Sequence, residues 1–196
     1  MICVQTISGD EEEFILANKT EDDKWIERGK QILRSPYVTE WFKAPVGLTH
    51  MIRKEKAEFK SFGSFTAPPA TKHSIIILLP DMKNKSYRAQ VIDPSNLGFQ
   101  KGKALVLNYG NVSALVKMGD KTFTVAKGKQ LVTDIDANEH GKLRLTIGHR
   151  DKDKNIIPCY DKFLSTDQKT RKFILLFPYQ DSGLRATTLT EFGPFE

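Results

Sequence analysis

Residues 115–125 read LVKMGDKTFTV, and this stretch decides the fold class. Apolar and polar residues alternate on both sides of Gly119-Asp120, and a period of two is typical of strands with one buried face. Glycine accepts the positive φ of a two-residue type I′ or II′ turn, so this dipeptide suits a hairpin tip. The stretch therefore predicts two antiparallel strands, with Phe123 and Val125 on the same face.

The same period of two recurs along most of the chain, with turn residues between the runs. Residues 75–79 are apolar on both faces, which predicts a central strand covered on both sides. Strands and helices do not alternate, so we expect an all-β protein, an antiparallel β-sandwich of about ten strands with at most one short helix. The runs that suggest strands, not all of which need be separate strands of the sandwich, are residues 2–7, 13–17, 37–42, 57–63, 75–79, 87–92, 103–107, the two of the hairpin, 143–147, 156–160, 172–177 and 184–189.

The N-terminal segment, residues 1–36, is acidic and contains the one helix candidate. Residues 1–27 hold eight acidic residues and two lysines. Within 21–34, Trp25, Ile26, Ile32 and Leu33 fall at seven-residue spacing, which favours a helix, whereas Gly29 weakens it and leaves a loop with one helical turn as an alternative. We expect this segment to form an edge strand plus a short helix or loop.

The length of 196 residues, of which 39% are hydrophobic, allows one large domain or two small ones. We expect a single sandwich domain over 1–196. No apolar run approaches the ~18 residues that a membrane span needs, so the sequence predicts none.

Charge offers the first functional hypothesis. The chain carries 30 basic and 24 acidic residues, so the part after residue 27 has 28 against 16, an excess of +12. Such an excess attracts polyanions, and an alternative is a lysine-rich surface that only keeps the protein soluble. The candidate residues for binding a polyanion or single-stranded nucleic acid are Lys101, Lys103, Lys127, Lys129, Lys169, Arg171 and Lys172.

The motifs of known chemistry are absent or incomplete. Residues 98–104 lack the Ser or Thr of a phosphate loop, and residues 151–162 lack the glycine and the glutamate of a calcium loop. Asp134 and Asp136 share a face on a strand, which is typical of a solvated edge strand or, alternatively, of an acid–base pair. The four histidines (His50, His73, His140 and His149) are isolated, and we expect them at the surface. The sequence thus indicates no catalytic residue, metal ligand or cofactor. It favours a protein that is not an enzyme and leaves a hydrolase as an alternative.

Two cysteines, Cys3 and Cys159, leave the cellular compartment open. They could form a disulfide in an exported protein, or remain reduced and buried. Residues 1–6 lack the basic and apolar regions of a signal peptide, so the chain is either cytoplasmic or a mature form with an added methionine.

One ordered set of turn and strand signals resembles a known group. From Asp93 to Asn108 the sequence follows Asp-x-Ser-x-x-x-Phe-x-x-Gly-x-x-x-x-x-Asn, and residues 125–128 (VAKG) and 171–178 (RKFILLFP) come later. Over about residues 75–190 this order resembles an uncharacterised group of exported, β-rich bacterial proteins. Lys127 stands where that group has proline, and tryptophans expected near the last hairpins are absent. The resemblance carries no activity and implies a periplasmic or envelope setting.

Together these observations favour a non-catalytic binding or structural module of the bacterial cell envelope, with a protein or glycan partner. The first alternative is a polyanion or single-stranded nucleic-acid binder, and the second is a hydrolase whose site is assembled from distant residues.

Overall fold

The structure is a computed structural model, and it describes residues 1–3, 5–7, 11–34, 37–38, 42, 47–67, 73–138, 140–180 and 183–192. These residues form sixteen strands and no helix, which confirms the all-β class. The chain divides into two compact units, Met1–Pro94 and Ser95–Glu196, where the sequence analysis expects one sandwich over its whole length.

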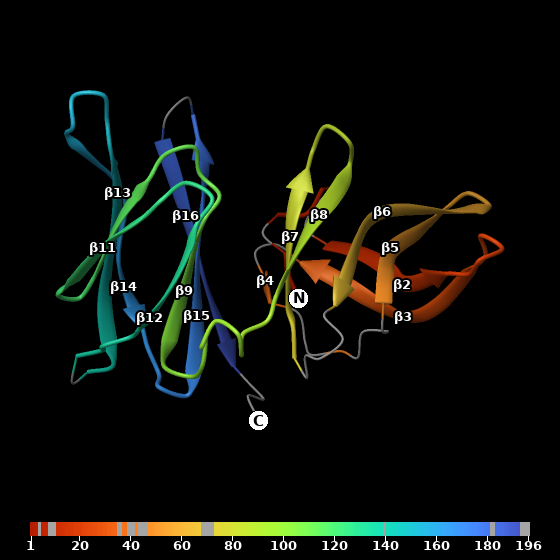
Figure 1. Ribbon diagram of the computed structural model, residues 1–196, viewed down its shortest axis with the longest axis horizontal. Helices are drawn as coiled ribbons and strands as arrows, with labels where there is room; N and C mark the ends of the chain where they lie inside the picture. The colour runs from red at the N-terminus through yellow and green to blue at the C-terminus, as the bar shows by residue number, and fades with distance from the viewer. Residues whose placement is uncertain are drawn as a thin grey trace. The chain divides into compact units, whose positions relative to one another are not determined.

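The first unit contains a single eight-stranded sheet (Figure 1). Its strand order is β3-β2-β5-β6-β8-β7-β1-β4. The strands are β1 (Ile2–Cys3), β2 (Glu11–Lys19), β3 (Trp25–Arg34), β4 (Tyr37–Val38), β5 (Gly47–Glu55), β6 (Glu58–Ala67), β7 (Ile75–Asp81) and β8 (Ser86–Ile92).

This sheet is strongly curled around its own core. Strands β2 and β8 are three positions apart in the order, about 14 Å in a flat sheet. Nevertheless the Tyr87 hydroxyl of β8 donates a buried hydrogen bond of 2.5 Å to Glu12 Oε2 of β2. The core cluster likewise joins Leu33 of β3 to Leu78 of β7 and Cys3 of β1, so both ends of the sheet share one interior.

Residues 21–34 are the clearest correction to the sequence analysis. Instead of a helix or loop, a turn at 20–23 leads into β3, which pairs with β2 along its length. Asp23 takes a left-handed φ of +64° in that turn, and the Lys24 amide donates to Thr20 Oγ1 at 3.0 Å. Because β3 is an edge strand with most side chains exposed, it shows little of the alternation that identifies strands.

The second unit consists of two four-stranded sheets that form the layers of a sandwich (Figure 1). One sheet has the order β11-β10-β13-β14 and the other β12-β9-β15-β16. The strands are β9 (Lys103–Asn108), β10 (Ala114–Met118), β11 (Lys121–Val125), β12 (Gln130–Asp134), β13 (Lys142–Arg150), β14 (Ile156–Ser165), β15 (Thr170–Tyr179) and β16 (Gly183–Phe192).

A shared core joins these two sheets. Val116 and Ile147 of the first sheet lie in one buried cluster with Val106, Ile174 and Leu176 of the second. The sequence predicts an antiparallel sandwich of about ten strands over the whole chain, whereas residues 95–196 alone form two packed sheets with eight strands. One of the two sheets is mixed, because β9 and β15 are parallel neighbours.

The predicted hairpin and the doubly apolar strand both appear as expected. Strands β10 and β11 pair from Ala114↔Val125 to Met118↔Lys121, and Gly119 has a φ of +57° in the turn. All five residues from Ile75 to Leu79 are buried. The predicted strand over 37–42 is described only at Tyr37–Val38 and Phe42, and the rest lies outside the described residues.

Candidate functional site

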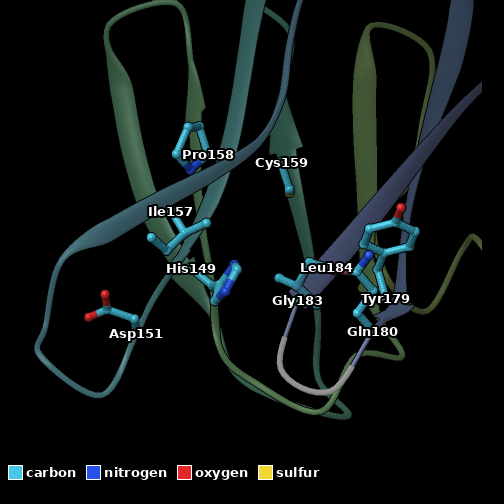
Figure 2. A pocket seen from close by; sticks show the side chains of 9 residues that line it. All are labelled: His149, Asp151, Ile157, Pro158, Cys159, Tyr179, Gln180, Gly183 and Leu184. Carbon is cyan, nitrogen blue, oxygen red and sulfur yellow. The ribbon is translucent and has the colours of Figure 1, made fainter.

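A pocket of about 540 Å³ opens between the two sheets of the sandwich, at the end where β14 and β16 begin (Figure 2). Its first wall comes from the β13–β14 hairpin and its second from the β15–β16 hairpin. Deeper in the sandwich, the hydroxyls of Tyr160 and Thr188 form a hydrogen bond of 3.2 Å between the same two edge strands. The lining residues are His149, Asp151, Ile157, Pro158, Cys159, Tyr179, Gln180, Gly183 and Leu184.

His149 is the most unusual of these residues. The residue is 5% exposed, and its Nδ1 atom is buried with no hydrogen-bond partner among the described residues. Such an unpaired buried polar atom costs about 1–3 kcal/mol, so most proteins avoid it. The sequence predicts His149 at the surface, but the structure shows that it is buried. The signal was present, because His149 continues the inward alternation of Leu143, Leu145 and Ile147 along β13.

A β-bulge shapes the wall beside His149. The β13–β14 register shifts between Ile147 and Gly148, which pair with Tyr160 and Pro158, so Cys159 is the extra residue. A Cβ atom on Gly148 would lie 2.8 Å from the Ile157 carbonyl oxygen, so the bulge depends on glycine at this position.

Cys159 is a half-buried free thiol in this pocket. Burial raises its pKa, and the raised pKa keeps the thiol protonated at neutral pH. A protonated thiol is a weak nucleophile, so this environment is opposite to that of catalytic cysteines.

The second wall is formed around the tip of the β15–β16 hairpin. Tyr179 is half-exposed, and Gln180 has a left-handed φ of +51°. A Cβ atom on Gly183 would lie 2.7 Å from the Tyr179 carbonyl oxygen, so the close pairing of these two residues requires glycine. Leu184 follows on β16 and belongs to the sandwich core.

Among the described residues, the lining carries one carboxylate and no lysine or arginine. That carboxylate, Asp151, accepts hydrogen bonds from the Asn155 amide at 2.8 Å and from Asn155 Nδ2 at 3.3 Å, which close the hairpin turn. In Figure 2 it points away from His149. Apart from Asp151, the described lining therefore combines apolar walls with uncharged polar groups, and it holds no lysine or arginine to pair with an anion.

The structure separates the seven basic candidates. Lys101 and Lys103 lie at the start of β9, while Lys127 and Lys129 adjoin Asn108 at its other end, about 17 Å away for a strand of this length. Lys103 lies 3.6 Å from Asp134 in an ion pair. Lys169 precedes β15, beside the start of β9.

The last two basic candidates are buried. Arg171, 4% exposed, donates to Glu191 Oε2 and to the Phe99 carbonyl, and its guanidinium lies over the Phe99 ring. Lys172 donates to Thr190 Oγ1 at 2.6 Å. Both side chains hold the fold together, and we therefore propose no polyanion site on this set.

The remaining sequence candidates lie apart from one another. Cys3 and Cys159 are both free thiols and belong to different units. Asp136 pairs with Lys121 at 2.5 Å, whereas Asp134 pairs with Lys103, so the two carboxylates face different partners. Within the described ranges, no three metal-ligating side chains lie together, and no helix could cross a membrane.

Comparisons with known proteins add little. No protein-family model and no curated protein matches the chain. Among solved structures, the chain is similar to one titled "NMR structure of the protein from Eubacterium rectale", with a TM-score of 0.30 and 16% identity over 50% of this chain and 96% of that one. This likeness is too slight to bear on fold or function.

Proposed function

We propose that this protein is a non-catalytic binding module whose ligand enters the pocket at the mouth of the C-terminal sandwich. The observation that carries the proposal is His149, a buried side chain with an unpaired Nδ1 at a pocket of about 540 Å³. Pockets of 300–1,000 Å³ with apolar walls and a few polar groups are typical of small-molecule sites.

Two features favour binding over hydrolysis. Catalysis by a nucleophile needs an activated side chain next to a base, and the raised pKa of Cys159 opposes activation. The hydrogen bonds of Asp151 hold the hairpin turn and do not orient His149. The lining thus offers recognition groups without an activated nucleophile.

We place the module in the bacterial cell envelope, with a protein or glycan as the source of its ligand. The support for this setting is the resemblance over residues 75–190 to exported, β-rich bacterial proteins. Fractionation of the native host tests it, since the chain should then accompany periplasmic or surface markers.

Screening a library of charged and uncharged fragments by amide NMR tests the binding role. Hits should shift the amides of His149, Gln180 and Leu184 together, because these three residues border one pocket. Pro158→Trp places a bulky side chain on the exposed rim and should weaken those hits at least tenfold. Phe163→Trp is the matched control, on the same strand but outside the lining.

Hits that bind the Pro158→Trp variant as tightly as the native chain would contradict the proposal. So would a library in which no compound shifts the three amides.

A further inference from the structure

The chemistry of the lining narrows the class of ligand, and this inference rests on the proposed binding role. In the part of the chain that the structure describes, no lysine or arginine lines the pocket, and the carboxylate of Asp151 accepts hydrogen bonds from Asn155. An anionic group would lose its hydration without gaining a cation, so the lining favours an uncharged ligand. Ile157, Pro158 and Leu184 supply apolar surface for the body of that ligand.

The unpaired Nδ1 atom of His149 indicates which polar group the ligand should carry. In neutral imidazole, Nδ1 is either a donor or an acceptor, depending on the tautomer. A hydroxyl both donates and accepts, so it pairs with Nδ1 in either tautomer, whereas an ether oxygen only accepts. Because Nδ1 is shielded from water, a ligand hydroxyl adds a hydrogen bond without displacing one already made.

We propose that the pocket binds an uncharged ring compound through a hydroxyl that pairs with Nδ1 of His149. The proposed hydrogen bond requires the imidazole to turn about its Cβ–Cγ bond so that Nδ1 faces the pocket. The half-exposed ring of Tyr179 offers a face on which a flat or sugar-like ring can stack. A phenolic ring and a sugar share this chemistry, and the experiment separates them.

The test is an NMR titration of the whole chain with four probes: phenol, anisole, methyl β-glucoside and benzoate. Phenol, the glucoside or both should shift the pocket amides and the His149 ring nitrogens. Anisole lacks the hydroxyl and should bind about three- to tenfold more weakly than phenol, the range that one hydrogen bond accounts for. Benzoate should bind at least tenfold more weakly than the better hydroxyl probe. Which of phenol and the glucoside binds more tightly identifies the source of the hydroxyl.

His149→Phe keeps a ring of similar size and removes both nitrogens, so phenol and anisole should bind this variant equally. His140→Phe, at an exposed turn outside the pocket, should leave the preference for phenol unchanged. If His149→Phe fails to fold, the titration of the native chain with the four probes still tests the proposed ligand class.

Two results with shifts at the pocket amides would overturn the ligand class and leave the binding role intact. One is equal binding of anisole and phenol, and the other is tight binding of benzoate. If none of the four probes shifts the pocket amides while other fragments do, the ligand class also fails. If no compound of any kind shifts them, the binding role fails with it.

Discussion

Arg171 is a buried cation whose guanidinium lies 2.7 Å from the Glu191 carboxylate and over the ring of Phe99. In the sequence it adjoins Lys169 and Lys172 and suggests a basic track, but its guanidinium is buried against Glu191 and Phe99. Nothing in the local pattern distinguishes an exposed arginine from a buried one, because its partner Glu191 is 20 residues away. The reverse holds for His149, whose inward position follows from the alternation of β13.

Arg171→Leu should lower the free energy of unfolding by about 3–5 kcal/mol, because it leaves the buried Glu191 carboxylate without its cation. Urea denaturation measures the change. Lys169→Leu, an exposed neighbour, should change stability by less than about 0.5 kcal/mol. Equal effects of the two variants would show that Arg171 has no structural role.

Cys3 should make stability depend on alkaline pH. Burial raises the pKa of its thiol to about 11 from 9.0, and burial also raises the pKa of Tyr87. Above pH 9 the unfolded chain releases the Cys3 proton while the folded chain keeps it, so the contribution of Cys3 to stability is constant below pH 9 and declines toward pH 11. The Cys3 contribution is about 2–3 kcal/mol. Denaturation curves from pH 7 to 11 should show a shallower decline for Cys3→Ala, and an unchanged slope would refute this account.

Among the sequence signals for strands and turns, the residues typical of turns predict the structure most reliably. The Gly119-Asp120 hairpin and the polar tip at 151–155 are both where the sequence places them. The sequence predicts no strand over β5 (Gly47–Glu55) or β12 (Gln130–Asp134), and it favours a helix or loop where β3 lies. In β3 the seven-residue spacing of Trp25 and Ile32 fits a helix, but pairing with β2 outweighs that local preference.

The bulge in β13–β14 offers a test at this scale. Gly148→Ala should lower the free energy of unfolding by about 1–3 kcal/mol, because the new methyl group meets the Ile157 carbonyl. Displacement of the backbone at Gly148 should also change the NMR resonances of the neighbouring His149. Gly29→Ala is the matched control, since a Cβ there meets nothing within 4 Å, and it should be neutral or slightly stabilising. A neutral Gly148→Ala would mean that the bulge does not constrain the pocket wall.

The all-β class of the protein could be predicted from the sequence, but its division into two compact units could not. Periodicity says which face of a strand is buried, but not which strands share a core. The boundary lies in Asp93-Pro94-Ser95, a short turn with no linker-like composition. The candidate site could not be predicted either, because its two walls come from hairpins about 30 residues apart and periodicity does not show that they meet.

The net charge of +6 should produce only weak, nonspecific attraction to polyanions. Arg171 and Lys172 are buried, and several exposed cations already pair with carboxylates. The chain should therefore elute from heparin below about 0.15 M salt. Replacing Lys127 and Lys129 by alanine should matter no more than replacing Lys101 and Lys169. If affinity for heparin falls steeply with salt, and if one of these lysine pairs accounts for most of that affinity, the chain has a polyanion site after all.

The most direct measurement is the rate at which N-ethylmaleimide, itself a small uncharged molecule, modifies Cys159 in the native chain, followed by mass spectrometry at pH 8. Cys3, fully buried, is the internal control. We predict that Cys159 reacts at least tenfold faster than Cys3, and that a ligand of the pocket slows only the reaction of Cys159. If Cys159 is as unreactive as Cys3 until the chain unfolds, no small molecule enters the mouth of the sandwich, and the proposed binding role is wrong.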